Sequence, residues 1–168
     1  MNTFFKVLAA AMRPSTLPPA PKMKRKQQYG ALPVRLKDGK LEVLLITSRG
    51  TGRWIIPKGW PKKQRSPHKL ALLEAYEEAG IRGKIERLEI GHYDYIKWID
   101  EHHSVACRVG VFVMKVRDVL NKWPEMHERT RRWVTPEEAS QLVDEPQLSA
   151  LLAGLHAKKI TQKPLKSA

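Results

Sequence analysis

The sequence predicts a single domain of mixed strands and helices, either an α+β fold or a layered α/β/α fold. The chain has 168 residues, a length that suits one domain better than two. Apolar residues make up 42% of it, which is enough for a hydrophobic core and excludes a wholly disordered chain. Short apolar segments bounded by turn residues alternate with segments that carry helix-start and helix-end signals.

The body of the chain opens with a predicted β-hairpin. Tyr29–Leu36 reads as one strand, and the apolar run Leu41–Thr47 reads as a second, buried strand. Between them stands Asp38-Gly39, a dipeptide strongly favoured in two-residue hairpin turns. Arg53–Pro57 then reads as a short extended segment that its proline ends.

A helix over Pro67–Ala79 follows from signals at both of its ends. Ser66 is a residue type favoured at the helix N-cap, and Pro67 suits the first helical position. Gly80 stands where a helix C-terminal glycine belongs.

The second half predicts two longer strands and then shorter elements. The strands cover Lys84–Trp98 and His103–Val116, joined by a polar turn at Asp100–His102. The remaining predicted elements are a short strand at Trp133-Val134, a helix opened by Thr135-Pro136-Glu137-Glu138, and a last helix over about Gln147–Lys158.

The formal charge of +14 comes mainly from the two ends of the chain. Residues 1–28 and 156–168 supply ten basic side chains and no acidic one. We therefore expect a basic N-terminal extension over residues 1–27, one domain over residues 28–157 and a basic tail over residues 158–168. Solvated arms are the favoured interpretation of such ends, with weak contact to nucleic acid as the alternative.

The sequence favours a reducing compartment, for which the cytoplasm is our prediction. A single cysteine, Cys107, excludes an internal disulfide, and it lies on the apolar face of a predicted strand, which places it in the core. Residues 1–14 lack the positively charged start of a secretory signal and are interpreted as a short helix or a mobile tail before a linker at residues 14–20. No apolar run is long enough for a membrane span, so we expect no membrane partner.

Three carboxylates on the predicted helix are the main chemical signal. Glu74, Glu77 and Glu78 fall within one arc of the helix, and apolar residues occupy nearly all of the remaining circumference. We expect this helix to be buried except for that stripe, whose like charges need a partner. The partner is either the basic segment at residues 49–69 or a divalent cation held by carboxylate oxygens.

The segment Gly59–Ile81 resembles the Nudix box, G-x5-E-x7-R-E-U-x-E-E-x-G-U, over 23 positions. Three positions depart from it: Arg65 replaces a glutamate, Leu73 replaces the arginine that helps to orient the carboxylates, and Ala75 is small for its place. The matching residues are Gly59, Glu74, Glu77, Glu78, Gly80 and Ile81.

Outside the box, the layout of Ser48–Trp54 is similar to the diphosphoinositol polyphosphate phosphohydrolases, as are Trp123-Pro124-Glu125 and the run Arg129–Val134. The resemblance implies the α/β class, as an α/β/α sandwich with a mixed β-sheet. It also implies a divalent-metal-dependent hydrolase that cleaves a diphosphate linkage in a highly phosphorylated small molecule. The substrate classes it suggests are diphosphoinositol polyphosphates and dinucleoside polyphosphates.

The same resemblance implies roles for individual residues. Glu74 and Glu78 would bind Mg²⁺ or Mn²⁺, with the backbone carbonyl of Lys58 as a further ligand and Glu77 as an additional ligand or the general base. Glu101, Glu125 or Glu128 could instead supply a base from a loop. The candidates for binding substrate phosphates are Arg35, Ser48, Arg49, Arg53, Lys58, Arg129 and Arg131.

Two alternatives stay open at this point. One is hydrolysis at an RNA 5′ end, with the basic ends of the chain gripping the strand. The other is a non-catalytic module that binds a phosphorylated partner, its helix carboxylates serving only as counter-charges. Four tryptophans, Trp54, Trp60, Trp98 and Trp123, could stack on a base, although tryptophans at strand ends more often pack in the core or at its rim.

Overall fold

The computed structural model describes residues 24–156, which form one mixed eight-stranded sheet and three helices. The expectations for residues 1–23 and for the C-terminal tail lie outside the described residues. Strand β1 begins at Lys26, slightly before the expected start of the domain. The elements are β1 (Lys26–Lys37), β2 (Lys40–Thr47), β3 (Trp54–Ile55), β4 (Lys58–Gly59), α1 (Pro67–Ala79), β5 (Ile81–Ile85), β6 (Gly91–Trp98), β7 (Ser104–Val119), β8 (Arg131–Val134), α2 (Pro136–Leu142) and α3 (Pro146–Ala153).

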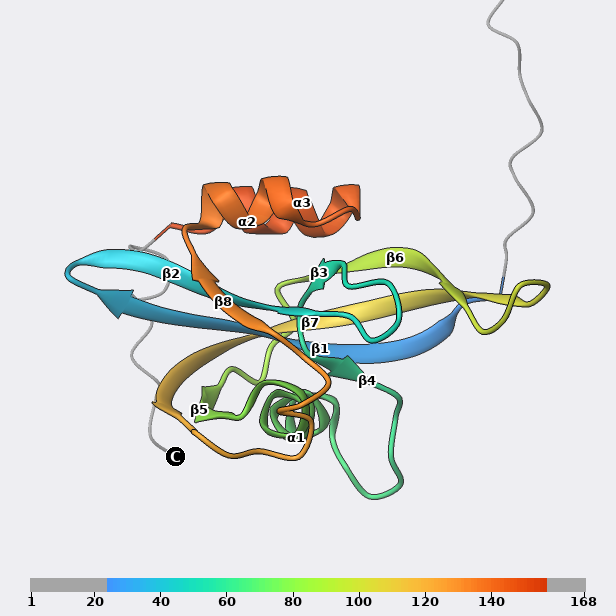
Figure 1. Ribbon diagram of the computed structural model, residues 1–168, viewed down its shortest axis with the longest axis horizontal. Helices are drawn as coiled ribbons and strands as arrows, with labels where there is room; N and C mark the ends of the chain where they lie inside the picture. Colours follow the sequence, from blue (N-terminus) through green and yellow to red (C-terminus); the bar gives the residue numbers. More distant parts are fainter. Residues whose placement is uncertain (1–23, 157–168) are drawn as a thin grey trace, which may run out of the picture.

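Strand β1 is the centre of the sheet. It pairs parallel with β7 and antiparallel with β2 and β4, which makes the sheet mixed. Helix α1 covers one face, and α2 with α3 covers the other (Figure 1). This is the layered α/β/α arrangement, and it excludes the α+β alternative.

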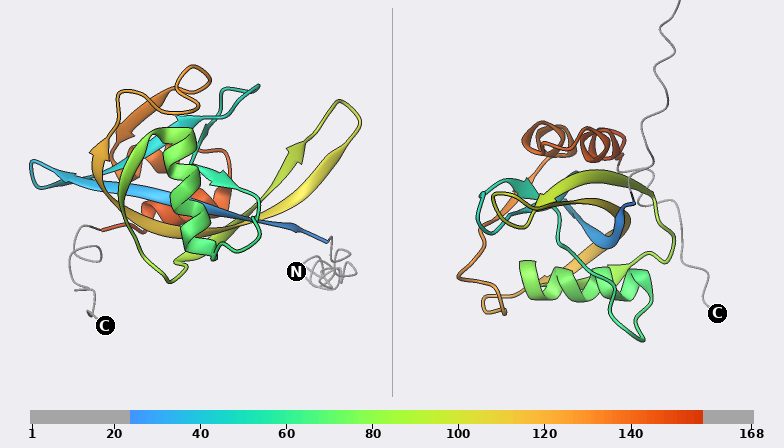
Figure 2. Two further views of the ribbon diagram at one scale, coloured as in Figure 1. Left: turned by 90° about the horizontal axis from the view of Figure 1, so that it is seen from below. Right: turned by 90° about the vertical axis from the view of Figure 1, so that its right-hand side faces the viewer.

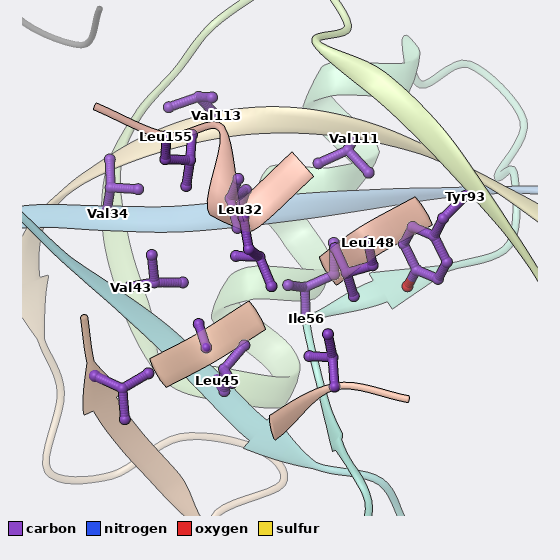
Figure 3. Packing of buried hydrophobic residues seen from close by; sticks show 14 of the residues in the cluster. Leu32, Val34, Val43, Leu45, Ile56, Tyr93, Val111, Val113, Leu148 and Leu155 are labelled. Atoms are coloured by element: carbon purple, nitrogen blue, oxygen red, sulfur yellow. The ribbon is translucent and has the colours of Figure 1, made fainter. Parts of the chain in front are cut away.

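Two apolar clusters hold the layers together. On the face of α2 and α3, Leu148 and Leu152 pack with sheet residues such as Leu32 and Val111 (Figure 3). On the opposite face, the alanines of α1 at positions 71, 75 and 79 pack against Leu44, Ile46 and other residues of the sheet. These alanines lie one turn apart on one side of the helix, so their small side chains let α1 approach the sheet closely. The small residue Ala75 is thereby explained by packing, since it is fully buried.

The local signals in the first half of the body are confirmed. Asp38 and Gly39 both have positive φ, 50° and 73°, as a tight turn between β1 and β2 needs. Helix α1 begins and ends at the predicted residues, and Gly80 caps it in the left-handed conformation. Ser66 has the backbone of an N-cap, but its side chain makes no capping hydrogen bond.

Two predicted elements were wrong in extent. The expected strand Lys84–Trp98 is two strands, because residues 86–90 leave the ladder between β5 and β6, held to β7 only by the amides of Glu86 and Ile90. The last helix, expected to reach Lys158, ends at Ala153, with Gly154 as its C-cap residue. Cys107 is buried, as predicted.

Among residues 24–156, no helix has the length and apolar character that crossing a membrane requires.

Gly80 and Gly39 provide a test of what fixes the end of α1. Both have positive φ, but a Cβ on Gly80 would overlap the Trp123 ring, whereas a Cβ on Gly39 would meet nothing. We expect Gly39→Ala to lower the free energy of unfolding by about 1 kcal/mol through backbone strain alone. Gly80→Ala should lower it by about 3 kcal/mol, because overpacking is added to that strain. Urea unfolding of the two variants measures both values, and equal losses would contradict the role given to Trp123.

Candidate active site

A cleft of about 720 Å³ lies beside α1, where the loop after β2, strand β4 and the end of β6 meet. Its lining contains more basic than acidic side chains. The basic ones are Arg49, Arg53, Lys58, Lys62, Lys97 and Arg129, and the acidic ones are Glu74, Glu78 and Glu125. A cleft of this composition suits an anionic ligand bound close to a few carboxylates.

The α1 carboxylates lie deeper than expected. Glu74 and Glu78 are each only 8% exposed, which makes them more buried than the neighbouring Leu73. The expectation of an exposed acidic stripe was therefore wrong for Glu74 and Glu78, because these two carboxylates face β4 and the cleft. Glu74 fits there because Gly59 has no side chain, and a Cβ at Gly59 would overlap the Glu74 carboxyl group.

Both carboxylate oxygens of Glu78 accept a hydrogen bond. Arg129 Nη2 donates to Oε1 at 2.5 Å, and the backbone N–H of Lys58 donates to Oε2 at 3.0 Å. Burial nevertheless raises the pKa of Glu78 to about 7, although Arg129 and Lys58 oppose this effect. Further positive charge in the cleft would therefore stabilise the ionised form of Glu78.

Arg129 is the cation that orients Glu78. Its side chain is 4% exposed, and its other nitrogens donate to Glu125 Oε2 at 2.6 Å and to the carbonyl of Thr47 at 3.0 Å. A guanidinium with these three partners has little donor capacity left for a phosphate. Arg129 lines the cleft, but its contacts are those of a residue that positions carboxylates, in a protein that has Leu73 in place of the box arginine.

Lys62 neutralises the other two carboxylates of α1. Its ammonium nitrogen lies 3.1 Å from Glu74 Oε1 and 3.4 Å from Glu77 Oε2. The basic segment at residues 49–69 therefore does supply a partner, as one of the two interpretations of the acidic stripe required. The Lys62 side chain is 44% exposed, which leaves it free to swing away from the cleft.

The residues present fit a hard divalent cation by donor type and burial. Glu74 and Glu78 offer carboxylate oxygens beside the cleft, where the missing side chain of Gly59 makes room for the Glu74 carboxyl group. Each oxygen of Glu78 has a lone pair beyond the hydrogen bond it accepts. The side chains of residues 24–156 contain no preformed group of three His, Cys, Asp or Glu placed to hold a metal. Water or backbone oxygens would therefore have to complete the coordination, and Lys62 would have to move.

The structure brings four of the other predicted substrate ligands to the cleft. Ser48, Arg49, Arg53 and Lys58 all line it. Arg53 is held by Asp144 and Glu145, with its Nη1 3.0 Å from Glu145 Oε1. Burial lowers the pKa of Lys58, whose ammonium lies over the Tyr95 ring.

Two predicted substrate ligands, Arg35 and Arg131, lie outside the cleft lining. Arg35 pairs with Glu42 across the β1–β2 hairpin and stacks on Trp133. Arg131 donates to the carbonyls of Ala79 and Leu120 and stacks on Trp123, so it ties the end of α1 to the end of β7. Their positive charge is used within the fold.

The sequence did not identify Lys62 and Lys97 as cleft residues, although Lys62 lies within the segment Gly59–Ile81 that resembles the Nudix box. Glu125, which also lines the cleft, was only one of three candidate loop bases. Glu77 does not itself line the cleft, and its side chain is 35% exposed and paired with the cleft residue Lys62. Glu125 and Arg129 are four residues apart in the loop between β7 and β8. The path of this loop brings Arg129 to Glu78 on α1, and no local pattern in the sequence predicts that approach.

Comparison with known proteins identifies the family. Residues 24–154 match the NUDIX domain family. The chain is 34% identical over 122 residues to Nudix hydrolase 18, mitochondrial, of Arabidopsis thaliana, covering 68% of this chain and 67% of that protein. It is 36% identical over 105 residues to diphosphoinositol polyphosphate phosphohydrolase 3-alpha of Mus musculus, covering 61% and 60%. A third relative, Nudix hydrolase 12, mitochondrial, of Arabidopsis thaliana, is 33% identical over 106 residues, or 61% of this chain and 52% of its own length. The chain thus spans about half to two thirds of the length of these relatives.

Solved structures share the fold. A crystal structure of a C. elegans Ap4A hydrolase has a TM-score of 0.56 at 21% identity, covering 77% of this chain and 95% of that one. The NUDIX domain of Shewanella oneidensis NrtR, complexed with ADP ribose, has a TM-score of 0.57 at 16% identity, covering 87% and 95%. Together with the family match, these neighbours confirm the predicted resemblance and fold class.

Arg129 and Arg132 test how much the buried ion pair contributes to stability. Arg129→Gln leaves Glu78 and Glu125 without their shared cation in a buried place, so we expect a loss of roughly 3 to 5 kcal/mol in the free energy of unfolding. Arg132, which pairs with Glu138 at the surface, is the matched control, and Arg132→Gln should cost less than about 1 kcal/mol. Urea unfolding at neutral pH with a chelator compares them, and similar losses would show that Arg129 does not hold the carboxylates.

The raised pKa of Glu78 predicts a pH-dependent stability of the metal-free protein. The folded protein retains this proton up to a pH of about 7, whereas an unfolded glutamate loses it near 4.5, so the stabilisation is present at low pH and is lost as the pH rises between those values. Relative to Glu78→Gln, the wild type should lose about 3 kcal/mol between pH 4.5 and 8. Urea unfolding of both proteins at pH 4.5 and pH 8 in the presence of a chelator measures the difference, and parallel pH profiles would disprove it.

Proposed function

Because the chain belongs to the NUDIX domain family, we propose that it is a divalent-metal-dependent hydrolase that cleaves a diphosphate linkage in a highly phosphorylated small molecule. The observation that carries the proposal is the pair of buried carboxylates, Glu74 and Glu78, beside a cleft whose other charged side chains are mostly basic. A relative named diphosphoinositol polyphosphate phosphohydrolase 3-alpha supports the substrate class of diphosphoinositol polyphosphates. Dinucleoside polyphosphates are the second substrate class that we propose.

Glu74, Glu78 and the backbone carbonyl of Lys58 would hold Mg²⁺ or Mn²⁺. When bound, such an ion makes a water molecule more nucleophilic and reduces the charge on the leaving phosphate. Arg129 donates to Oε1 of Glu78 and keeps the carboxylate in one orientation, with Oε2 toward the backbone N–H of Lys58. Gly59, which has no side chain, leaves room for the carboxyl group of Glu74 beside β4.

The remaining residues would act on water and substrate. Glu77, the most exposed of the three carboxylates, would accept a proton as general base once Lys62 has turned away from it. Ser48, Arg49, Arg53 and Lys58 would bind phosphate oxygens. Lys58 would gain most from an anion, because it is half-buried and its ammonium has no ion pair with a carboxylate among the residues described.

A non-catalytic phosphate-binding module is the second candidate function. The observation that favours it is that Lys62 and Arg129 neutralise the α1 carboxylates within the protein itself. Hydrolysis of an RNA 5′ end would draw on the basic ends of the chain, which lie outside the described residues. The cytoplasm is our proposed compartment, since Cys107 is a buried free thiol.

Glu78→Gln separates the hydrolase from the binding module. The variant keeps the size of the side chain but removes the charge that would bind the metal ion. We expect turnover to fall by about 100-fold or more. The measurement is phosphate, nucleotide or inositol product released from a panel of diphosphates with Mg²⁺ or Mn²⁺.

Glu137→Gln, a change at an exposed glutamate of α2, is the matched control and should keep wild-type turnover. A wild-type protein inert toward the whole panel would favour the binding module. Undiminished turnover in Glu78→Gln would rule out the metal role of Glu78.

A further inference from the structure

The turn between α2 and α3 contacts the cleft through one arginine. Asp144 and Glu145 lie in this turn, and both accept a hydrogen bond from Nη1 of Arg53, Asp144 Oδ2 at 3.3 Å and Glu145 Oε1 at 3.0 Å. Arg53 lines the cleft, whereas neither acid does. Helices α2 and α3 lie on the side of the sheet opposite α1 (Figure 2, right), so carboxylates outside the cleft hold a cation inside it.

Glu145 is a buried acid that helix capping does not explain. It is only 6% exposed and stands at the N-cap of α3, but its side chain makes no capping hydrogen bond, and glutamate is not a residue favoured there. Its Oε1 pairs with Arg53, and its Oε2 is buried without a hydrogen-bond partner. Burial of a carboxylate is costly unless a cation accompanies it. Among residues 24–156, Arg53 is the only cation paired with Glu145.

Arg53 is held at its backbone as well as at its guanidinium. Its N–H donates to Ser48 Oγ at 3.0 Å, and its carbonyl accepts from the N–H of Ser48 at 2.8 Å, which closes the loop before β3. Residues 24–156 supply no hydrogen-bond partner for Nε or Nη2 of Arg53. Arg129 differs, because all three of its side-chain nitrogens donate to protein groups. Arg53 therefore has a position set by the protein and N–H groups left for a ligand.

We propose that Glu145 is a positioning residue that holds Arg53 ready to bind phosphate in the cleft. Glu145 fixes Nη1 and leaves the N–H groups of Nε and Nη2 for phosphate oxygens. A guanidinium that is held in place before the ligand arrives loses less side-chain freedom on binding, so it binds the anion more tightly. This inference rests on the proposed function, in which Arg53 binds a substrate phosphate.

The direction of one effect separates positioning from simple electrostatics. Glu145→Gln keeps the size of the side chain and removes a negative charge beside Arg53. By Coulomb attraction alone, loss of that charge strengthens the binding of an anion in the cleft. If Glu145 positions Arg53, the same change weakens the binding, because the ligand must then order the arginine itself.

The experiment is a titration of inorganic pyrophosphate into the full-length protein, with a chelator and without metal, by isothermal titration calorimetry. Arg53→Gln should weaken binding about ten-fold through the loss of a charged hydrogen-bond donor. Glu145→Gln should weaken it roughly five-fold. In the Arg53→Gln background, Glu145→Gln should weaken it no further, because no arginine is left to position. Glu137→Gln, the same change at an exposed residue of α2, is the matched control and should leave the Kd unchanged.

A second measurement follows the arginine itself. In the free wild-type protein, the NMR order parameter of the Arg53 Nε–H bond should be that of an ordered group, and in Glu145→Gln it should fall below about 0.6. Arg132, which pairs with Glu138 at the surface, is the internal control and should have the same order parameter in both proteins. An Arg53 order parameter that Glu145→Gln leaves unchanged would overturn the positioning role.

The outcomes distinguish this inference from the proposed function. Equal or tighter pyrophosphate binding by Glu145→Gln, with weaker binding by Arg53→Gln, would overturn the positioning role and leave Arg53 as a phosphate ligand. Unchanged binding by Arg53→Gln would overturn both the positioning role and the phosphate-binding role of Arg53. A protein that shows the expected losses in pyrophosphate binding but cleaves no diphosphate with Mg²⁺ or Mn²⁺ would support the positioning role and refute the hydrolase function.

Discussion

The burial of Glu74 and Glu78 is the constraint that determines how the surrounding groups are arranged. A carboxylate removed from water must find hydrogen bonds and positive charge or lose its ionisation. Here separate parts of the chain supply the hydrogen bond and the positive charge: the backbone N–H of Lys58, the ammonium of Lys62 and the guanidinium of Arg129. The raised pKa of Glu78 shows that this compensation is incomplete. An incompletely neutralised carboxylate in a cleft is suited to bind a further cation.

The loop between β7 and β8 is organised around the same end of α1. Trp123 fills the space that Gly80 leaves and donates to the carbonyl of Glu78, while Arg131 donates to the last carbonyls of the helix. Thr130 exchanges hydrogen bonds with Thr47, which fixes this loop to the end of β2. The contacts that end the helix therefore also set the position of Arg129. Stability and site geometry depend here on one set of residues.

The sequence predicted what depends on local signals and missed what depends on the path of the chain. The hairpin turn at Asp38-Gly39, the bounds of α1 and the cap at Gly80 follow from neighbouring residues, and the structure has each of them. The break between β5 and β6 was missed because β7, a distant partner, determines where pairing stops. Arg35, Arg129 and Arg131 all read as surface cations able to meet phosphate. Their real partners lie on other elements, and only the folded chain shows that Arg129 lies at the carboxylates whereas the other two do not.

The departure from the box at Leu73 is best understood in three dimensions. In the sequence it removes an arginine directly before Glu74 and leaves the carboxylates without their expected orienting cation. In the fold, a guanidinium reaches Glu78 from the loop before β8 and is itself held by Glu125 and Thr47. A cation fixed by three partners orients a carboxylate more firmly than a side chain free on a helix surface, because less rotamer freedom is lost when the ion pair forms. A carboxylate site of this kind needs a buried cation within hydrogen-bonding distance of the carboxylate. The position of that cation in the sequence matters less than its position in the fold.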